Sequence, residues 1–122
     1  MGRPRVQPDR EQRIDDEVIV DAYDSTERAM SWYYYLEGKL HFPFAASCIA
    51  RRQSSPLKVG ERVEVVGMAS EDECMSEALV VVNRSKTKLA VPLGQIKCDS
   101  GDEQTCQAVE DWHYWLARGY TY

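Results

Sequence analysis

The hydrophobic positions between residues 25 and 40 recur with the spacing of an α-helix. They lie three or four residues apart and would share one side of the helix: Ala29, Tyr33, Leu36 and Leu40. Just before them, Asp24 can accept a hydrogen bond from the first turn, and Glu27 follows at the spacing of a capping box. We therefore predict a helix from Ser25 to about Leu40.

Two further segments show helical patterns. The segment 13–22 carries apolar residues four apart, and we predict a short helix there, although its β-branched run also favours a strand. Near the C-terminus, a second apolar face predicts a helix that begins after Ser100 or Asp102 and ends at Gly119. This face consists of Ala108, Val109, Trp112, Trp115 and Leu116.

Between residues 42 and 98 the pattern changes to that of β-strands. Val63 and Val65 alternate with Arg62 and Glu64, which is typical of a half-buried antiparallel strand. The predicted strands are 42–50, 57–68, 79–83 and 89–93, with a turn at 84–88. The segment 91–96 is similar to the one-turn helix that closes small barrels. Short strands separated by polar turns favour a small SH3-like antiparallel β-barrel.

The order of these elements predicts an α+β fold, in which the SH3-like barrel is flanked by N-terminal and C-terminal helices. A chain of 122 residues suits one domain. Residues 1–12 contain two prolines, three arginines and few apolar side chains, so we predict a flexible basic tail there. Residues 13–122 would form a single domain.

The balance of charges narrows the classes of partner. With 20 carboxylates against 15 lysines and arginines, the net charge is −5, which disfavours nucleic acid and suits cations or simple solubility. The longest apolar run, 78–82, is too short to cross a membrane. The four cysteines show no CxxC pair, and no apolar signal stretch opens the chain, so we expect reduced thiols and a cytoplasmic location.

Catalytic motifs are missing from the chain. There is no glycine-rich nucleotide-binding motif and no HExxH, and neither His41 nor His113 lies in a recognisable catalytic pattern. The aromatic run 111–115 is more typical of a core than of a ligand site. We therefore predict that the protein is not an enzyme. A Cys–His pair in a concave pocket would be required to reverse this prediction.

The remaining chemistry lies in the carboxylates. Ca²⁺ takes about six to eight oxygen ligands, so a site needs several acids close together on a loop that can turn its carbonyls inward. The best local candidates are Glu71, Asp72 and Glu73, with Glu77 four residues beyond. Glu37 would join them if the end of its helix packs beside this loop. For each acid taken alone, a solvated surface charge is the competing interpretation.

Two weaker acidic clusters stay open as alternatives. They are Asp15-Asp16-Glu17 and Asp99 with Asp102-Glu103, and the second has a competing role at a helix N-terminus. The EF-hand pattern of alternating acids, a glycine at the sixth position and a glutamate at the twelfth is absent. The residues by themselves make a Ca²⁺ site one possibility among others.

A family resemblance strengthens this possibility. The chain resembles small calcium-binding proteins of cyanobacteria and archaea that lack EF-hands. The resemblance rests on segments spread in one order over residues 14–120: Val20-Asp21-Ala22-Tyr23, Trp32-Tyr33-Tyr34-Tyr35-Leu36-Glu37, Phe42-Pro43-Phe44, Ser55-Pro56-Leu57-Lys58-Val59-Gly60, Ala90-Val91-Pro92-Leu93 and Glu110-Asp111-Trp112-His113-Tyr114-Trp115. It implies cytosolic Ca²⁺ buffering by acidic side chains at more than one site, with no reaction catalysed.

The chain departs from the family pattern at one position. Relatives often carry a second acid directly after the glutamate of the tyrosine motif, and here that position is Gly38. The resemblance then implies weaker binding, or reliance on Glu37 and the 71–77 loop. The alternative function is a protein-interaction module in which exposed aromatics of the SH3-like barrel bind a proline-rich peptide.

Overall fold

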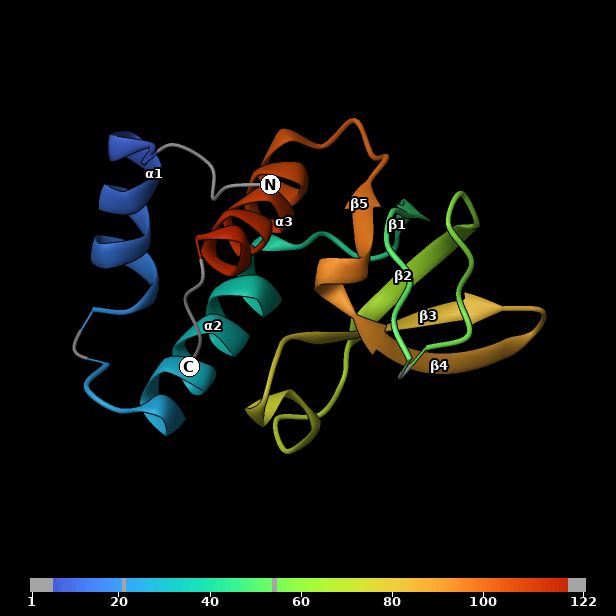
Figure 1. The fold of residues 1–122 in the computed structure, drawn as a ribbon, viewed down its shortest axis with the longest axis horizontal. Helices are drawn as coiled ribbons and strands as arrows, with labels where there is room; N and C mark the ends of the chain where they lie inside the picture. The colour runs from blue at the N-terminus through green and yellow to red at the C-terminus, as the bar shows by residue number, and fades with distance from the viewer. Residues whose placement is uncertain (1–5, 21, 54, 119–122) are drawn as a thin grey trace.

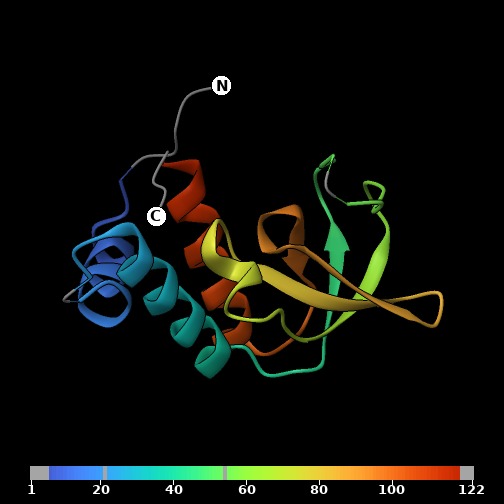
Figure 2. The same ribbon diagram turned by 90° about the horizontal axis from the view of Figure 1, so that it is seen from below.

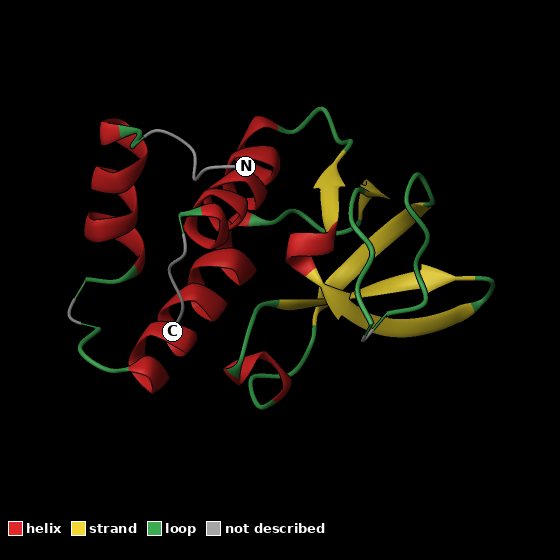
Figure 3. Cartoon of the chain, viewed as in Figure 1, coloured by secondary structure: helices red, strands yellow, loops and turns green. Residues whose placement is uncertain are grey.

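The computed structural model describes residues 6–20, 22–53 and 55–118, and it places helices beside a five-stranded antiparallel sheet (Figures 1 and 3). Along the chain the elements are α1 (Pro8–Arg13), η1 (Ile14–Val18), α2 (Ser25–Lys39), β1 (Phe44–Cys48), β2 (Arg62–Met68), η2 (Glu73–Met75), β3 (Leu79–Arg84), β4 (Thr87–Pro92), η3 (Leu93–Gln95), β5 (Ile96–Cys98) and α3 (Glu103–Ala117). The α+β class is therefore confirmed.

The two long helices begin where their capping residues predict. The Asp24 carboxylate accepts a hydrogen bond from the Glu27 amide at 2.8 Å at the start of α2. At the start of α3, Asp102 accepts from the Gln104 amide at 3.3 Å. Both caps satisfy amides that have no partner within the helix. The predicted end of the second helix, Gly119, lies outside the described residues.

The N-terminal segment differs from the prediction. Residues 8–12, which composition assigns to a flexible tail, are helical in α1, and Pro8 takes a first-turn position that suits its fixed φ. The helix is held on α3 through Tyr114, whose hydroxyl donates to Glu11 Oε1 at 2.8 Å and accepts from the Gln7 amide at 3.1 Å. Composition misses α1 because these contacts come from the far end of the chain.

The sheet has the strand order β4-β3-β2-β1-β5. The strands 44–48 and 62–68 are shorter than the predicted 42–50 and 57–68, and β5 was not predicted as a strand. The one-turn helix predicted within 91–96 is present as η3. Within the described residues β4 and β5 do not pair with each other, so a closed barrel is not confirmed.

The β3–β4 hairpin is tighter than the predicted turn at 84–88. Ser85 and Lys86 have φ values of 48° and 68°, which are typical of the two central residues of a type I′ turn. Such a turn matches the twist of paired strands, so pairing continues to Arg84 opposite Thr87. The hairpin extends away from the helices (Figures 1 and 2).

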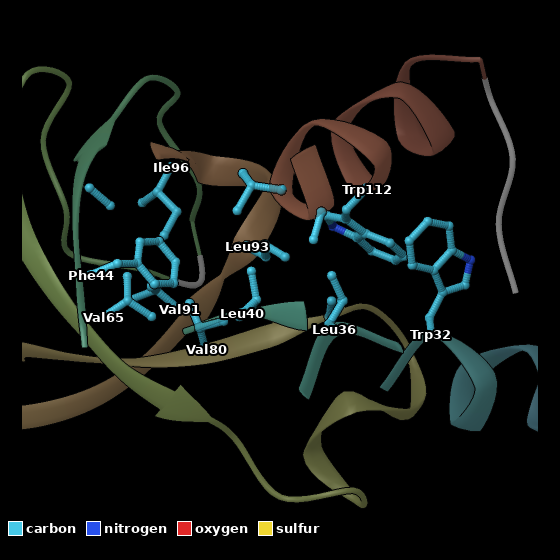
Figure 4. Close-up of a cluster of buried hydrophobic side chains, with 14 of the residues drawn as sticks. Trp32, Leu36, Leu40, Phe44, Val65, Val80, Val91, Leu93, Ile96 and Trp112 are labelled. Atoms are coloured by element: carbon cyan, nitrogen blue, oxygen red, sulfur yellow. The ribbon is translucent and has the colours of Figure 1, made fainter. Parts of the chain in front are cut away.

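One hydrophobic core joins the sheet to the helices. Phe44, Val65 and Ile96 fill the inner side of the sheet, and the cluster continues towards the tryptophans of α2 and α3 (Figure 4). There Trp32 and Trp112 pack edge to face with ring centroids 5.0 Å apart, and both are essentially unexposed. This arrangement confirms the aromatic run 111–115 as core and places the acidic β2–β3 loop beside α2.

Candidate metal centre

The acidic loop between β2 and β3, residues 69–78, is anchored by its own buried residues. Cys74 and Ala78 are each 1% exposed, and the Cys74 thiol donates to the Leu79 carbonyl at 3.4 Å. The Ala69 amide donates to the same carbonyl at 3.0 Å, which closes the loop at its base. With its small residues pointing inward, the loop presents its carboxylates to solvent.

Helix α2 meets this loop through a tyrosine. Tyr34 is exposed on α2, and its hydroxyl donates to Glu71 Oε1 at 2.9 Å. This hydrogen bond, followed by the negative charge of Glu71, raises the pKa of Tyr34. Helix α2 therefore packs beside the loop, and Glu37 lies on the same helix three residues after Tyr34.

Glu37 acts on the same pair of tyrosines, Tyr33 and Tyr34. Burial raises the pKa of Tyr33 to about 12, followed by a hydrogen bond to Glu37 and by the negative charges around it, including that of Glu71. The Tyr33 and Tyr34 rings pack edge to face at 5.5 Å. Glu37 and Glu71 thus come from different parts of the chain and act on the same two hydroxyls.

The other loop acids have different surroundings. Glu73 and Ser70 bond reciprocally, since the carboxylate accepts from the Ser70 amide at 3.1 Å and the Ser70 hydroxyl accepts from the Glu73 amide at 3.3 Å. Glu77 is half-buried, and both of its oxygens lie 2.8 Å from Arg52 Nη2. Asp72 is exposed and makes no side-chain hydrogen bond or ion pair to another described residue. Of the three, Asp72 is the most available to an ion.

These acids are not assembled into a finished site. Within residues 6–20, 22–53 and 55–118, no three histidine, cysteine or acidic side chains are grouped so that they could hold a metal ion. The donors that α2 and the loop bring together are carboxylate and phenol oxygens. That chemistry fits a hard cation such as Ca²⁺ and does not fit a metal that prefers sulfur or nitrogen.

In the weaker acidic clusters, Asp16, Asp99 and Asp102 form hydrogen bonds with neighbouring side chains. Asp102 contacts His41 and accepts from the Thr105 hydroxyl at 2.6 Å, and this second bond is the main reason that its pKa is lowered. The Asp99 carboxylate accepts from Ser47, and Asp16 accepts from Gln12 at 2.7 Å. Helix capping and local bonding therefore account for these acids.

Both histidines contact α3 or the segments beside it. His113 donates from Nε2 to the Ile96 carbonyl at 2.6 Å, and burial lowers its pKa. His41 contacts Asp102 and Gln104. In the described part of the chain, neither histidine is hydrogen-bonded to a cysteine. These contacts give both histidines a place in the packing of α3.

Two partners of the acidic loop were missed from the sequence. The tyrosine motif drew attention to α2, but only the fold shows that Tyr34 reaches Glu71. Arg52 lies 25 positions before Glu77 in a loop with no pattern of its own, and no signal in the sequence links the two. Contacts over such distances in the chain become visible only in three dimensions.

Comparison with known proteins agrees with this acidic, oxygen-rich surface. A family model of the CcbP type, described as "Calcium binding", matches residues 12–116. The chain belongs to this calcium-binding family. The crystal structure of Anabaena CcbP is 40% identical, covers 100% of both chains and superposes with a TM-score of 0.88. The family resemblance inferred from the sequence is confirmed.

A second solved structure is also similar to this chain. It is described as a calcium-binding protein in the calcium-binding form, with 40% identity, 95% coverage of both chains and a TM-score of 0.85. A search of curated proteins found no match. Among the described residues, no helix combines the length and apolar character needed to span a bilayer.

Proposed function

We propose that this CcbP-type protein binds Ca²⁺ on the surface shared by the acidic loop and α2, and that it acts as an intracellular Ca²⁺ buffer or sensor. The observation that carries the proposal is the Tyr34–Glu71 hydrogen bond, which holds a loop carboxylate beside the helix that bears Glu37. Glu37, Glu71 and Asp72 would supply the first charged ligands. Membership of the calcium-binding family supports the same ion.

Binding would require the loop to rearrange. Glu71 would turn from the Tyr34 hydroxyl towards the ion, and Glu73 would leave the amide of Ser70 if it contributes. Neighbouring carboxylates repel each other in the free protein, and a divalent cation between them removes this repulsion. Glu77 is the weakest of the five candidates, because its charge is already offset by Arg52.

The surrounding fold and location belong to the same proposal. The strand order and the one-turn helix η3 before β5 support an SH3-like barrel that is open between β4 and β5. A cytoplasmic location is supported by the four free cysteines. An interaction module gains no support from the comparisons, and all three tryptophans, the largest aromatics, are buried.

Calorimetric titration with Ca²⁺ after chelator treatment tests the site. Replacing Glu71→Gln keeps the size of the side chain and removes its charge, so the Kd should rise about tenfold, or about 1.4 kcal/mol. The matched control is Glu64→Gln on β2, where the amide oxygen can still accept from Asn83. Its Kd should not change.

The possible results separate the alternatives. If Glu71→Gln binds as tightly as the unchanged protein, the site lies elsewhere, and the 15–17 and 99–103 clusters become the next to test. If the unchanged protein gives no heat of binding and no thermal shift with Ca²⁺, the proposal is rejected.

A further inference from the structure

Two of the four cysteines meet where β5 leads into α3. Cys98 is the last residue of β5, and Cys106 lies in the first turns of α3. The two thiols lie close enough for Cys106 to raise the pKa of Cys98. The Cys106 thiol also lies 3.2 Å from the Ser100 carbonyl and 3.9 Å from the Cys98 carbonyl. Eight positions apart in the chain, the two sulfurs are neighbours in space.

This pair differs from the other two cysteines in its access to solvent. Cys48 and Cys74 are 2% and 1% exposed, whereas Cys98 and Cys106 are both partly exposed. Cys98 and Cys106 also line a cavity of about 250 Å³, whose other walls include Val109 and His113. A molecule as small as a peroxide can therefore reach them, while the other thiols are enclosed by the core.

We propose that Cys98 and Cys106 form a reversible intramolecular disulfide when the protein meets a peroxide. The sulfur of one thiolate attacks the peroxide, the O–O bond breaks, and the attacked oxygen becomes a sulfenic acid while the other leaves as water or an alcohol. The second sulfur then displaces the sulfenic oxygen, which leaves as water with the remaining proton. Two electrons pass from the sulfurs to the peroxide, and a small thiol reductant returns them.

The environment of the pair suggests which sulfur attacks first. Burial, followed by the neighbouring Cys106 thiol, raises the pKa of Cys98 to about 12. Because the thiolate is the attacking species, Cys98 is the poorer nucleophile at neutral pH. We assign the attack on the peroxide to Cys106, whose thiol lines the same cavity, and the closing of the bridge to Cys98.

The bridge would change how the sheet is attached to the helices. β5 is an edge strand that pairs only with β1 among the described strands. A bond from Cys98 to Cys106 would close the loop 99–105 covalently and tie this edge to α3. Restricting a loop in the unfolded chain favours the folded state, provided that the bond forms without strain.

The test treats the full chain with hydrogen peroxide and counts thiols after unfolding. Two of the four should be lost, peptide mapping without reductant should find one cross-linked pair that contains Cys98 and Cys106, and dithiothreitol should restore all four. In Cys98→Ser, Cys106 should instead accumulate as a sulfenic acid that dimedone traps. Cys74→Ser is the matched control and should still form the bridge.

Two results would overturn the proposal. The first is a wild-type chain that keeps all four thiols after treatment with excess hydrogen peroxide. The second is a cross-link that joins a different pair, or one that forms only between molecules. The wild-type peptide map decides these points even if a serine variant does not fold.

Discussion

The protein holds its carboxylates in two contrasting ways. In the helical layer, Asp111 is 0% exposed and is enclosed by cations and a hydroxyl. Arg13 donates to both of its oxygens at 2.6 and 3.1 Å, Tyr35 donates at 2.8 Å, and Arg10 lies 3.2 Å away. On the acidic loop, Glu71 has a neutral phenol as its partner, and Asp72 is exposed.

The contrast separates a structural acid from a binding acid. The lone pairs of Asp111 are used by partners from two other helices, α1 and α2, so an incoming cation would have to displace two arginines. Glu71 is hydrogen-bonded to a neutral hydroxyl, and among the described residues it forms no ion pair with a cation. An ion can therefore gain more from the loop than from the buried cluster, although the buried cluster contributes more to stability.

The largest expected effect comes from breaking the buried cluster. Replacing Asp111→Asn leaves Arg13 without its charged partner, and we expect the free energy of unfolding to fall by about 3 kcal/mol, measured by urea denaturation. Glu110→Gln is the control, because Glu110 is mostly exposed beside Arg10 and should contribute less than about 0.5 kcal/mol. Ca²⁺ affinity of the folded variant should stay unchanged.

A loss of Ca²⁺ binding in folded Asp111→Asn, with stability retained, would contradict this division. It would mean that the buried acid belongs to the ion site and that the loop does not. Comparing the denaturation curve with the titration of the same preparation separates the two effects.

How much the sequence predicts differs between these regions. The caps of α2 and α3 were predictable because Asp24 and Asp102 act on amides two or three residues away. The helix at residues 8–12 was not, because its stability depends on α3, about a hundred positions later. Local chemistry is readable in the chain, whereas contacts between distant segments are not.

The candidate site shows the same limit. The run 71–73 was visible as a cluster of charge, and Glu37 could be added only on the condition that α2 packs beside the loop. The sequence gives no means of separating Asp72, which is free of side-chain partners among the described residues, from Glu77, which Arg52 neutralises. In the sequence, Asp72 and Glu77 are both acids in a polar segment, and only the fold shows which partners each one has.

A smaller effect is expected from adding a negative charge to α2, beside the acidic loop. Gly38 lies on α2 directly after Glu37, and a Cβ built there would meet nothing within 4 Å. Gly38→Asp should therefore fit without strain and lower the Kd for Ca²⁺ about fivefold, or about 1 kcal/mol, in a calorimetric titration. Gly38→Asn is the control of the same shape, and its Kd should change less than twofold.

Equal effects of Gly38→Asp and Gly38→Asn would mean that helix stability, and not charge, changes the affinity, since both residues favour a helix slightly more than glycine does. No effect of either would place the ion away from this end of α2, on the far side of the loop.

The smallest expected effect is a change in tyrosine ionisation, and it compares the two regions directly. Tyr33 has a pKa raised to about 12, first by burial and then by Glu37 and nearby charges, including Glu71. These anions disfavour tyrosinate, so a Ca²⁺ ion bound between them should favour it and lower the pKa. Burial and a hydrogen bond to Asp111 raise the pKa of Tyr35, and Ca²⁺ should leave it unchanged.

Tyrosine labelled at Cζ allows each hydroxyl to be titrated by NMR with and without Ca²⁺. At a pH just below the midpoint of Tyr33, the ion should increase the ionised fraction of Tyr33 and not that of Tyr35; Tyr33→Phe assigns the signal. A response confined to Tyr35 would place the ion at Asp111, and the buried acid, not the loop, would then be the binding site. A response of Tyr33 alone requires the positive charge to lie within reach of Glu37 and Glu71, because elsewhere on the surface solvent and salt would screen it.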